Sequence, residues 1–418
     1  MDGGAQRRMG TSSMGKEKRI KKPHVLVVYP GLIPSVEISV LIPLRYLEKR
    51  GKIEMHAGTV AEMEFMRELS WCDIVVFSRC CLVNELPVLC KVRQLHIPYI
   101  YDLDDNFFRL AADKEQTQLF LQWPGVMETL KAFASGACVV KTGSEQIRMD
   151  MQPYNTNVVI HPYVFDFTLV RKPMHKSKKE TVIGYAGSLV HGQDLLMVCE
   201  ALNRIAQEYP EVRFAFYGAK PQDETALSQQ VMKRSEFIPF KRDYRAFIGD
   251  LSRRGWAIVL APLKDSITNR SKTDNKYREY SACGMAGVYS QMPVYERRIQ
   301  DGYNGMLADY NAQSWYEKIK YLLDHPGERE TIARRARNDV MKHNRIDVVA
   351  ERWLNDLILP NMQQELLPPE ERKRILKNIP DRIKIYRNAL SVLPKRAQRE
   401  FFIKWVGAFV KNALTGAL

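Results

Sequence analysis

The chain has 418 residues, of which 45% are hydrophobic and 27% charged, so it can bury full-sized cores and is not an intrinsically disordered polypeptide. Its formal net charge of +15 predicts an anionic partner, and nucleotide phosphates, an anionic membrane, a polyanionic acceptor and nucleic acid all stay open. The seven cysteines show neither CxxC pairs nor a Cys/His spacing suited to zinc, which favours reduced thiols in a cytoplasmic protein.

The N-terminal segment is basic but lacks the apolar region of a signal peptide. No stretch of about 18 apolar residues predicts a membrane span. We therefore expect a basic flexible lead over residues 1–22 and a protein that stays in the cytoplasm.

A first series of apolar strands follows this lead and alternates with helical segments. The expected strands are 24–30, 72–79, 97–105, 136–145 and 157–165. Continuous apolar runs of this kind are typical of a parallel sheet that helices cover on both faces. We expect an N-terminal Rossmann-like domain over residues 23–170.

A charged stretch without apolar period, residues 171–180, is the best candidate for a linker. A second series of strands begins directly after it. Its expected members are 181–188, 212–218, 235–240, 256–263 and 286–290. The sequence thus predicts an α/β protein with a second Rossmann-like domain over 181–345, and with two doubly wound domains facing a cleft.

The C-terminal part of the chain is predicted to be helical. We expect a crossover helix over residues 346–360 and a basic helical extension over 361–418. The end of this extension is amphipathic, with Phe402, Trp405 and Phe409 on one side of the helix. Such a helix can lie in a membrane interface, or it can pack on the protein's own surface or on a second subunit, and these alternatives stay open.

The most informative motif lies between residues 269 and 305. It places two ammonium groups, Lys272 and Lys276, and one carboxylate, Glu279, on a short segment beside the end of a predicted strand. Cations suit the phosphates of a ligand, and a carboxylate suits ribose or sugar hydroxyls. A phosphorylated, hydroxyl-rich ligand needs this combination, whereas a solvated charged loop is the simpler alternative.

In this segment the chain resembles GT-B glycosyltransferases of the retaining family 4 (group 1), particularly their bacterial surface-polysaccharide branch. The branch has the pattern N-x-x-K-S-x-x-K-x-x-E-Y-x-A-x-G-x-P-V-x-S. The residues in register are Asn269, Lys272, Thr273, Lys276, Glu279, Tyr280, Ala282 and Gly284, and Ser290 follows one position after the last serine of the pattern. The resemblance covers roughly residues 23–353 and implies a GT-B fold with a helical C-terminal extension. It also implies a nucleotide diphosphate sugar as substrate, with no cofactor and no metal.

The sequence departs from the family pattern at two places. Family members often carry two glutamates with seven residues between them; Glu279 fits the second, and Ser271 stands where the first would be. Ala286 and Gly287 replace a proline and a valine, although the segment keeps the buried character of a strand. We therefore do not expect two carboxylates to bind the donor together.

The resemblance implies roles for the residues of the second domain. Lys272 or Lys276 would neutralise the donor diphosphate, much as a metal ion does in other glycosyltransferases, and Glu279 would accept bonds from hydroxyls. A glycine turn at 183–195 resembles the family's phosphate-binding turn, in which the backbone and the following helix face phosphate. The implied donor-binding set is Gly187, Ser188, His191, Asp194, Ile238, Phe240, Asn269, Lys272, Thr273, Lys276 and Glu279.

The first domain offers an acidic run at the end of the strand 97–105. Asp104 and Asp105 could orient the acceptor or accept its proton, and with Lys276 and Glu279 they form the implied catalytic set. Asp102 and Asp104 also imitate a D-x-D metal motif, and a helix N-cap is a third alternative. On the acceptor side the candidates are Gly31, Arg79 and Ser144, with Arg79 expected to meet an anion.

The function implied is transfer of a sugar from a nucleotide diphosphate sugar to a hydroxyl, with retention, in the synthesis of surface polysaccharide or glycoconjugates. The acceptor would be a glycan or a lipid-linked molecule, and the enzyme would bind peripherally to the inner face of an anionic membrane. One rival is a GT-B enzyme that glucosylates DNA or another polyanion, although no basic face with interleaved aromatics favours nucleic acid. The other rival is a degenerate binding or scaffold subunit. The oligomeric state stays open.

Overall fold

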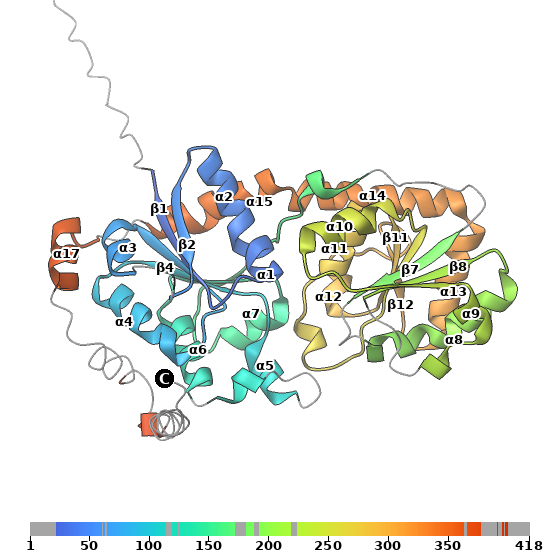
Figure 1. Ribbon diagram of the computed structural model, residues 1–418, viewed down its shortest axis with the longest axis horizontal. Helices are drawn as coiled ribbons and strands as arrows, with labels where there is room; N and C mark the ends of the chain where they lie inside the picture. Colours follow the sequence, from blue (N-terminus) through green and yellow to red (C-terminus); the bar gives the residue numbers. More distant parts are fainter. Residues whose placement is uncertain are drawn as a thin grey trace, which may run out of the picture.

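Two α/β domains lie side by side along the long axis of the computed structural model (Figure 1). The structure describes residues 22–60, 62, 65–113, 119–123, 125–171, 181–187, 192–218, 224–362, 366–377, 391, 395–396 and 398–399. Residues 1–21 of the predicted flexible lead and residues 172–180 of the predicted linker lie outside these residues, as do Ser188, His191 and the amphipathic end of the chain.

The N-terminal domain is built on a parallel sheet of six strands in the order β2-β1-β3-β4-β5-β6. The strands are β1 (His24–Val28), β2 (Glu54–Gly58), β3 (Ile74–Ser78), β4 (Tyr99–Leu103), β5 (Val139–Thr142) and β6 (Val158–Ile160). The helices are α1 (Pro34–Val36), a π-helical turn (Glu37–Leu41), α2 (Ile42–Lys49), α3 (Phe65–Trp71), α4 (Leu86–Gln94), α5 (Phe107–Ala112), α6 (Val126–Gly136) and α7 (Glu145–Met151). Every residue of β3 and β4 is buried because helices cover both faces of the sheet.

The C-terminal domain repeats this plan in the order β12-β11-β10-β7-β8-β9, and all its strand pairs are parallel. The strands are β7 (Val182–Ala186), β8 (Arg213–Tyr217), β9 (Ser235–Ile238), β10 (Ile258–Ala261), β11 (Ala286–Ser290) and β12 (Met306–Ala308). The helices are α8 (Gly192–Glu208), α9 (Gln229–Lys233), α10 (Tyr244–Arg253), α11 (Asn275–Ala282), α12 (Pro293–Glu296), α13 (Ala312–Asp324) and α14 (Pro326–Asn344). The predicted fold class, two doubly wound Rossmann-like domains, is confirmed.

The sequence did not reveal β2 and β12, two of the four edge strands, although it indicated the other two, β6 and β9. In β2 exposed and buried residues are mixed, so it lacks the continuous apolar run that marked the other strands of its sheet. Strand β12 has only three residues and falls in a stretch that reads as a turn. Edge strands need less apolar surface than central ones, which makes them hard to recognise.

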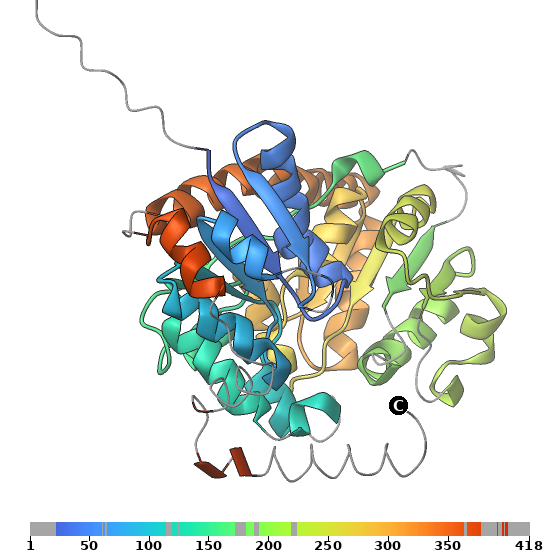
Figure 2. The same cartoon turned by 60° about the vertical axis from the view of Figure 1, so that its left-hand side comes forward.

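The chain returns from the second domain to the first after α14. Helix α15 (Ile346–Arg352) is followed by a π-helical turn (Trp353–Ile358) and by α16 (Leu359–Asn361). Helix α15 packs against α2, and Trp353 and Leu357 belong to the same buried cluster as the strand residue Val25 (Figures 1 and 2). Residues 346–361 therefore complete the core of the N-terminal domain.

Helix α17 (Pro369–Lys377) also packs on the N-terminal domain, against α3. Arg372 is buried there and donates hydrogen bonds to the backbone oxygens of Leu69 (3.2 Å) and Cys72 (2.6 Å). A guanidinium at a helix C-terminus satisfies carbonyl groups that the helix leaves unpaired. Of the helices in the described part of the chain, none is long and apolar enough to cross a membrane.

We expect the replacement of Trp353 by alanine to destabilise the N-terminal domain by roughly 3–5 kcal/mol, because the indole is fully buried and donates to the backbone oxygen of Ser39 (3.1 Å). Urea denaturation followed by circular dichroism measures the loss. Trp123, which is 54% exposed, is the matched control, and Trp123→Ala should change the free energy of unfolding by less than about 0.5 kcal/mol. Equal losses for both variants would contradict the packing of the crossover segment.

Candidate functional site

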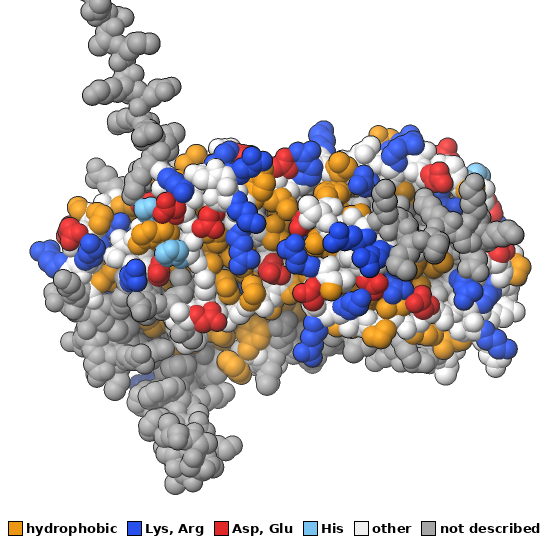
Figure 3. Space-filling view, turned by 45° about the horizontal axis from the view of Figure 1, so that its top comes forward, with side chains coloured by type: hydrophobic (Ala, Val, Ile, Leu, Met, Phe, Trp, Pro, Cys, Tyr) orange, Lys and Arg blue, Asp and Glu red, His pale blue; other side chains and the backbone are white. Residues whose placement is uncertain are grey.

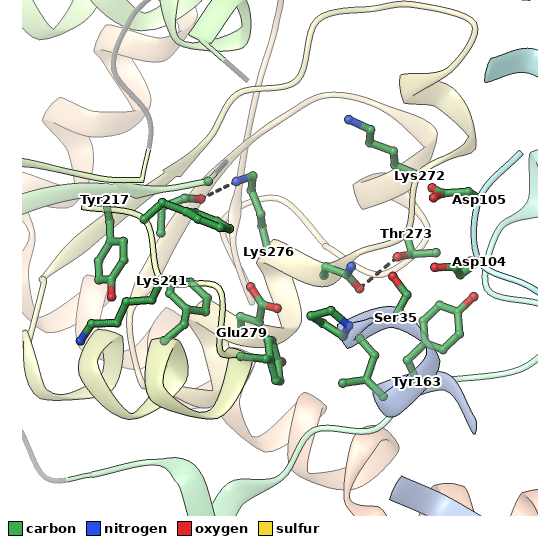
Figure 4. Close-up of a pocket in the computed structure, with 18 of the residues that line it drawn as sticks. Ser35, Asp104, Asp105, Tyr163, Tyr217, Lys241, Lys272, Thr273, Lys276 and Glu279 are labelled. Carbon is green, nitrogen blue, oxygen red and sulfur yellow. Dashed lines mark hydrogen bonds between the residues drawn. The ribbon is translucent and has the colours of Figure 1, made fainter. Parts of the chain in front are cut away.

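A pocket of about 410 Å³ opens between the two domains, at the carboxyl ends of their strands (Figure 4). The first domain contributes Pro34, Ser35, Ile38, Asp104, Asp105 and Tyr163. The second contributes Ala186, Gly187, Tyr217, Phe240, Lys241, Arg242, Tyr244, Phe247, Leu263, Lys272, Thr273, Asn275, Lys276, Glu279 and Tyr295. The acidic residues predicted on the first domain thus share one pocket with the lysines and the glutamate predicted on the second.

Lys276 and Glu279 reach the pocket because they lie three residues apart on α11 and so share one face of the helix. The Lys276 ammonium donates to the backbone oxygen of Ala186 and lies 4.5 Å from the ring centre of Tyr185. Burial lowers the pKa of Lys276 to about 8, although Glu279 and Asp194 partly offset this effect. The ammonium is thus held at the glycine turn after β7.

Gly187 allows this close approach. A side chain at this position would put its Cβ atom 2.4 Å from the Tyr185 hydroxyl and 3.0 Å from the Lys276 ammonium. A ligand phosphate can therefore approach the backbone and Lys276 together. Ser188 and His191, predicted on the same turn, lie outside the described residues.

The Glu279 carboxylate lies between two cations. Burial raises its pKa, and Arg278 and Lys276 oppose the rise. Arg278 is fully buried and donates to Asn275 and to Asp274 (3.4 Å). The hydroxyl of Tyr244 is close enough to influence Glu279, but it makes no hydrogen bond of normal geometry. Glu279 is therefore a hydrogen-bond acceptor that faces the pocket.

Lys272 supplies a further ammonium group to the pocket, which Lys241 and Arg242 also line. Its pKa is lowered by burial and raised by Asp194, Asp105 and Asp113. Within the described part of the chain its ammonium forms no ion pair, so it can bind an incoming anion. Thr273, the next residue, also lines the pocket and donates to the side-chain oxygen of Asn275 (3.0 Å).

Three residues of the predicted donor-binding set lie behind the pocket wall. Asp194 accepts a hydrogen bond from the backbone nitrogen of Lys264 (2.8 Å), and Asn269 donates to the backbone oxygen of the same residue (2.8 Å). Both are buried and hold the loop that leads to Lys272. Ile238 is buried at the end of β9, whereas Phe240 is 53% exposed and lines the pocket.

Arg79 has a different environment from the one expected. Its guanidinium pairs with Asp104 and with Asp105 (2.9 Å), so it does not offer a free cation to an acceptor anion. It instead holds both carboxylates at the edge of the pocket, from a backbone with φ of 59°. Desolvation in the cleft and the neighbouring Asp104 raise the pKa of Asp105, while Arg79 lowers it. Asn106 caps α5, which leaves the two aspartates free of capping.

Asp102 does not belong to a metal-binding D-x-D motif. It is 1% exposed and accepts bonds from the Lys141 ammonium (2.6 Å) and from the hydroxyls of Ser39 and Ser78 (both 2.8 Å). Its oxygens are therefore used inside the domain. Among the described residues no cluster of three or more His, Cys, Asp or Glu side chains suits a metal ion, and metal independence stays a prediction.

The remaining two acceptor-side candidates do not line the pocket that the described residues form. Gly31 lies in the loop after β1, and the space around its Cα is open. Ser144 is 4% exposed and precedes α7. The pocket also contains residues that the sequence did not indicate, among them Ser35, Tyr163 and Tyr217. No motif marks them, because only the fold brings their segments together.

Two facing parallel sheets, with a cleft between their carboxyl ends and a helix that returns to the first domain, define the GT-B class of glycosyltransferase folds. Within this fold, residues 180–325 match the family described as glycosyl transferases group 1. The predicted resemblance is confirmed at this level, whereas family 4 and its surface-polysaccharide branch stay predictions. None of the curated proteins compared with the sequence is significantly similar to it.

Solved structures show the same fold at low sequence identity. HepE from Anabaena, solved in complex with UDP, is 15% identical with a TM-score of 0.58, and the match covers 80% of this chain and 99% of HepE. A glycosyltransferase from Rickettsia africae is 12% identical with a TM-score of 0.57, over 86% of this chain and 100% of the other. Sucrose-phosphate synthase from Thermosynechococcus elongatus is 11% identical with a TM-score of 0.54, over 79% and 97%.

We expect Asp102→Asn to lower the free energy of unfolding by roughly 3–5 kcal/mol, because the fully buried Lys141 would lose its counter-charge. Asp104→Asn is the matched control, since Arg79 keeps its bond to Asp105, and a loss of about 1 kcal/mol is expected. Chemical denaturation of both variants measures the difference. A stable Asp102→Asn protein would show that the buried ion pair does not support the domain.

Proposed function

We propose that this protein is a glycosyltransferase that moves a sugar from a nucleotide diphosphate sugar to a hydroxyl group of an acceptor. This proposal rests on one observation: Lys276 of the second domain lies against the glycine turn, and Asp104 and Asp105 of the first domain line the same pocket. The family match over residues 180–325 supports this proposal. HepE, which shares the fold, has been solved with UDP and with UDP-glucose.

The charges of the pocket suit such a donor. Lys276 is a cation beside Gly187, and Lys272 lines the same pocket; together they neutralise the diphosphate and stabilise the leaving nucleoside diphosphate. Glu279 accepts bonds from hydroxyls of the ribose or the sugar. In this proposal the two ammonium groups do the work for which other glycosyltransferases use a metal ion.

The proposed reaction keeps the configuration of the anomeric carbon. The leaving phosphate accepts the proton of the incoming hydroxyl on the same face of the sugar, so no protein nucleophile is needed. Asp104 and Asp105 orient the acceptor, and Arg79 fixes both carboxylates.

The distribution of charge favours a membrane-bound acceptor over nucleic acid. Residues 1–22 contain 7 Lys and Arg against 2 Asp and Glu, and residues 361–418 contain 12 against 5, so these segments carry most of the net charge of +15. On the face in Figure 3, basic side chains are interspersed with acidic ones over both domains. The basic ends of the chain suit an anionic lipid surface near a lipid-linked or glycan acceptor, as in polysaccharide synthesis.

The affinity for UDP should fall roughly tenfold between pH 7 and pH 9.5, because Lys276 with a pKa of about 8 is charged below that pH and neutral above it. Isothermal titration calorimetry at several pH values measures the dependence. In the control variant Lys276→Arg the cation stays charged throughout, and the affinity should change much less. A wild-type affinity that is constant over this range would contradict a role for the Lys276 ammonium.

We expect Lys276→Ala to lower kcat/KM by 10²- to 10³-fold and Glu279→Gln by about 10- to 100-fold, because each removes a group that stabilises the bound donor or its leaving group. Release of the nucleoside diphosphate from a panel of nucleotide sugars measures the activity. Lys318→Ala is the control, since Lys318 forms an ion pair with Asp301 (2.6 Å) on the surface of the same domain. Binding without turnover would favour the scaffold alternative, and absence of both would refute the proposal.

A further inference from the structure

Tyr163 has a buried hydroxyl group that nothing in the described part of the protein binds. The residue follows β6, is 4% exposed and lines the pocket between the domains. Its oxygen is shielded from solvent and has no hydrogen-bond partner. A phenol in this position normally finds a partner, and an unpaired one destabilises the protein in which it stands.

The ring of Tyr163 is fixed on several sides. At Gly143 a Cβ atom would lie 2.4 Å from the ring, so a glycine is needed there. The Lys141 ammonium lies 4.6 Å from the ring centre, and Arg278 of the second domain lies 5.6 Å from it. The backbone oxygen of Tyr163 accepts a bond from Asn344 at the end of α14 (2.7 Å). The position of the hydroxyl is therefore set before any ligand binds.

The groups around the hydroxyl point to an uncharged, hydroxyl-bearing ligand. In Figure 4 the side chains of Ser35, Asp104 and Tyr163 gather in one part of the pocket, away from Lys241 and Tyr217. Among the described lining residues of the first domain none is a cation, and Arg79 behind them is already paired. A phosphate would meet the Asp104 carboxylate here and be repelled.

We propose that the Tyr163 hydroxyl donates a hydrogen bond to a carbohydrate hydroxyl, which in turn donates to the Asp104 carboxylate. A hydroxyl suits this position because it accepts and donates at the same time, as phosphate and carboxylate oxygens do not. This inference rests on the proposed function, and it adds a residue that selects the sugar. The carbohydrate is either the sugar of the donor or the acceptor, and the experiment separates these sources.

The test compares Tyr163→Phe with the wild type, using UDP and UDP-glucose as probes. The variant keeps the ring and removes only the unpaired oxygen, so its thermal stability without ligand should equal or exceed that of the wild type. If the hydroxyl binds the donor sugar, the affinity for UDP-glucose should fall about three- to tenfold while the affinity for UDP stays unchanged. If the hydroxyl binds the acceptor, the affinities for UDP and for UDP-glucose should both stay unchanged. In that case kcat/KM for transfer should fall about three- to tenfold, and the rate of UDP-glucose hydrolysis should not change.

A second tyrosine of the same domain provides the control. Tyr99 is 2% exposed, and its hydroxyl donates to the backbone oxygen of Phe133 (2.9 Å), far from the lining residues of the pocket. We expect Tyr99→Phe to lower the melting temperature and to leave the ratio of the two affinities unchanged. This opposite pattern separates loss of a structural hydrogen bond from loss of a ligand contact.

The outcomes distinguish this inference from the proposed function. If the wild type binds no nucleotide or nucleotide sugar of a panel that includes UDP and UDP-glucose, the proposed function fails and the role of Tyr163 fails with it. If the wild type binds and turns over its donor, and Tyr163→Phe keeps both affinities and full transfer activity, only the role of Tyr163 is overturned. A lower melting temperature of the ligand-free Tyr163→Phe protein would also overturn it, because the hydroxyl would then have a structural partner.

Discussion

The ion pair between Lys141 and Asp102 is the interaction on which the first domain depends. Both side chains are buried, and a buried ammonium is stable only when a counter-charge and hydrogen bonds compensate for its lost hydration. Desolvation lowers the pKa of Lys141, and Asp102 raises it. The pair joins β4 to β5, binds Ser39 of the π-helical turn and lies 5.1 Å from the ring of Trp353. Four segments that are distant in the sequence, namely β4, β5, the π-helical turn of Ser39 and the segment of Trp353, therefore come together around this ion pair.

At the junction between the domains near Asn344, which we call the hinge, this network continues to α11. Asn344, at the end of α14, donates to the backbone of Tyr163 and accepts from Arg298 (2.6 Å). Arg298 also binds Asp339 (2.7 Å) and Asp274 (2.9 Å), and Asp274 stands immediately before α11. A change of angle at the hinge would therefore move groups that contact the helix of Lys276. The polar contacts between Tyr163 and α11 therefore pass through Asn344, which is buried, and through Arg298, Asp339 and Asp274, which are part-buried.

The sequence predicts the pocket residues of the second domain better than those of the first, and the reason is the spacing of the residues. One loop and the helix after it hold Lys272, Lys276 and Glu279 within eight positions. Their closeness in space can therefore be predicted from the sequence without knowledge of the fold. Ser35 and Tyr163 are more than a hundred positions apart and meet only because parallel strands end at one edge of the sheet. The central strands were predictable from their continuous burial, whereas the pairing of Arg79 with two aspartates depends on tertiary structure alone.

Ser271 departs from the family pattern, and it makes a contact between the two domains. The pattern puts a glutamate at this position, but here Ser271 is 2% exposed and does not line the pocket that the described residues form. Its hydroxyl accepts a bond from Asn106 of the first domain (3.1 Å), and Thr268 nearby donates to Asp113 of that domain (2.6 Å). A glutamate would place a charge where a neutral pair of side chains now joins the domains. The loop before Lys272 is thus held against the first domain, and Glu279 remains the single carboxylate that α11 presents to the pocket.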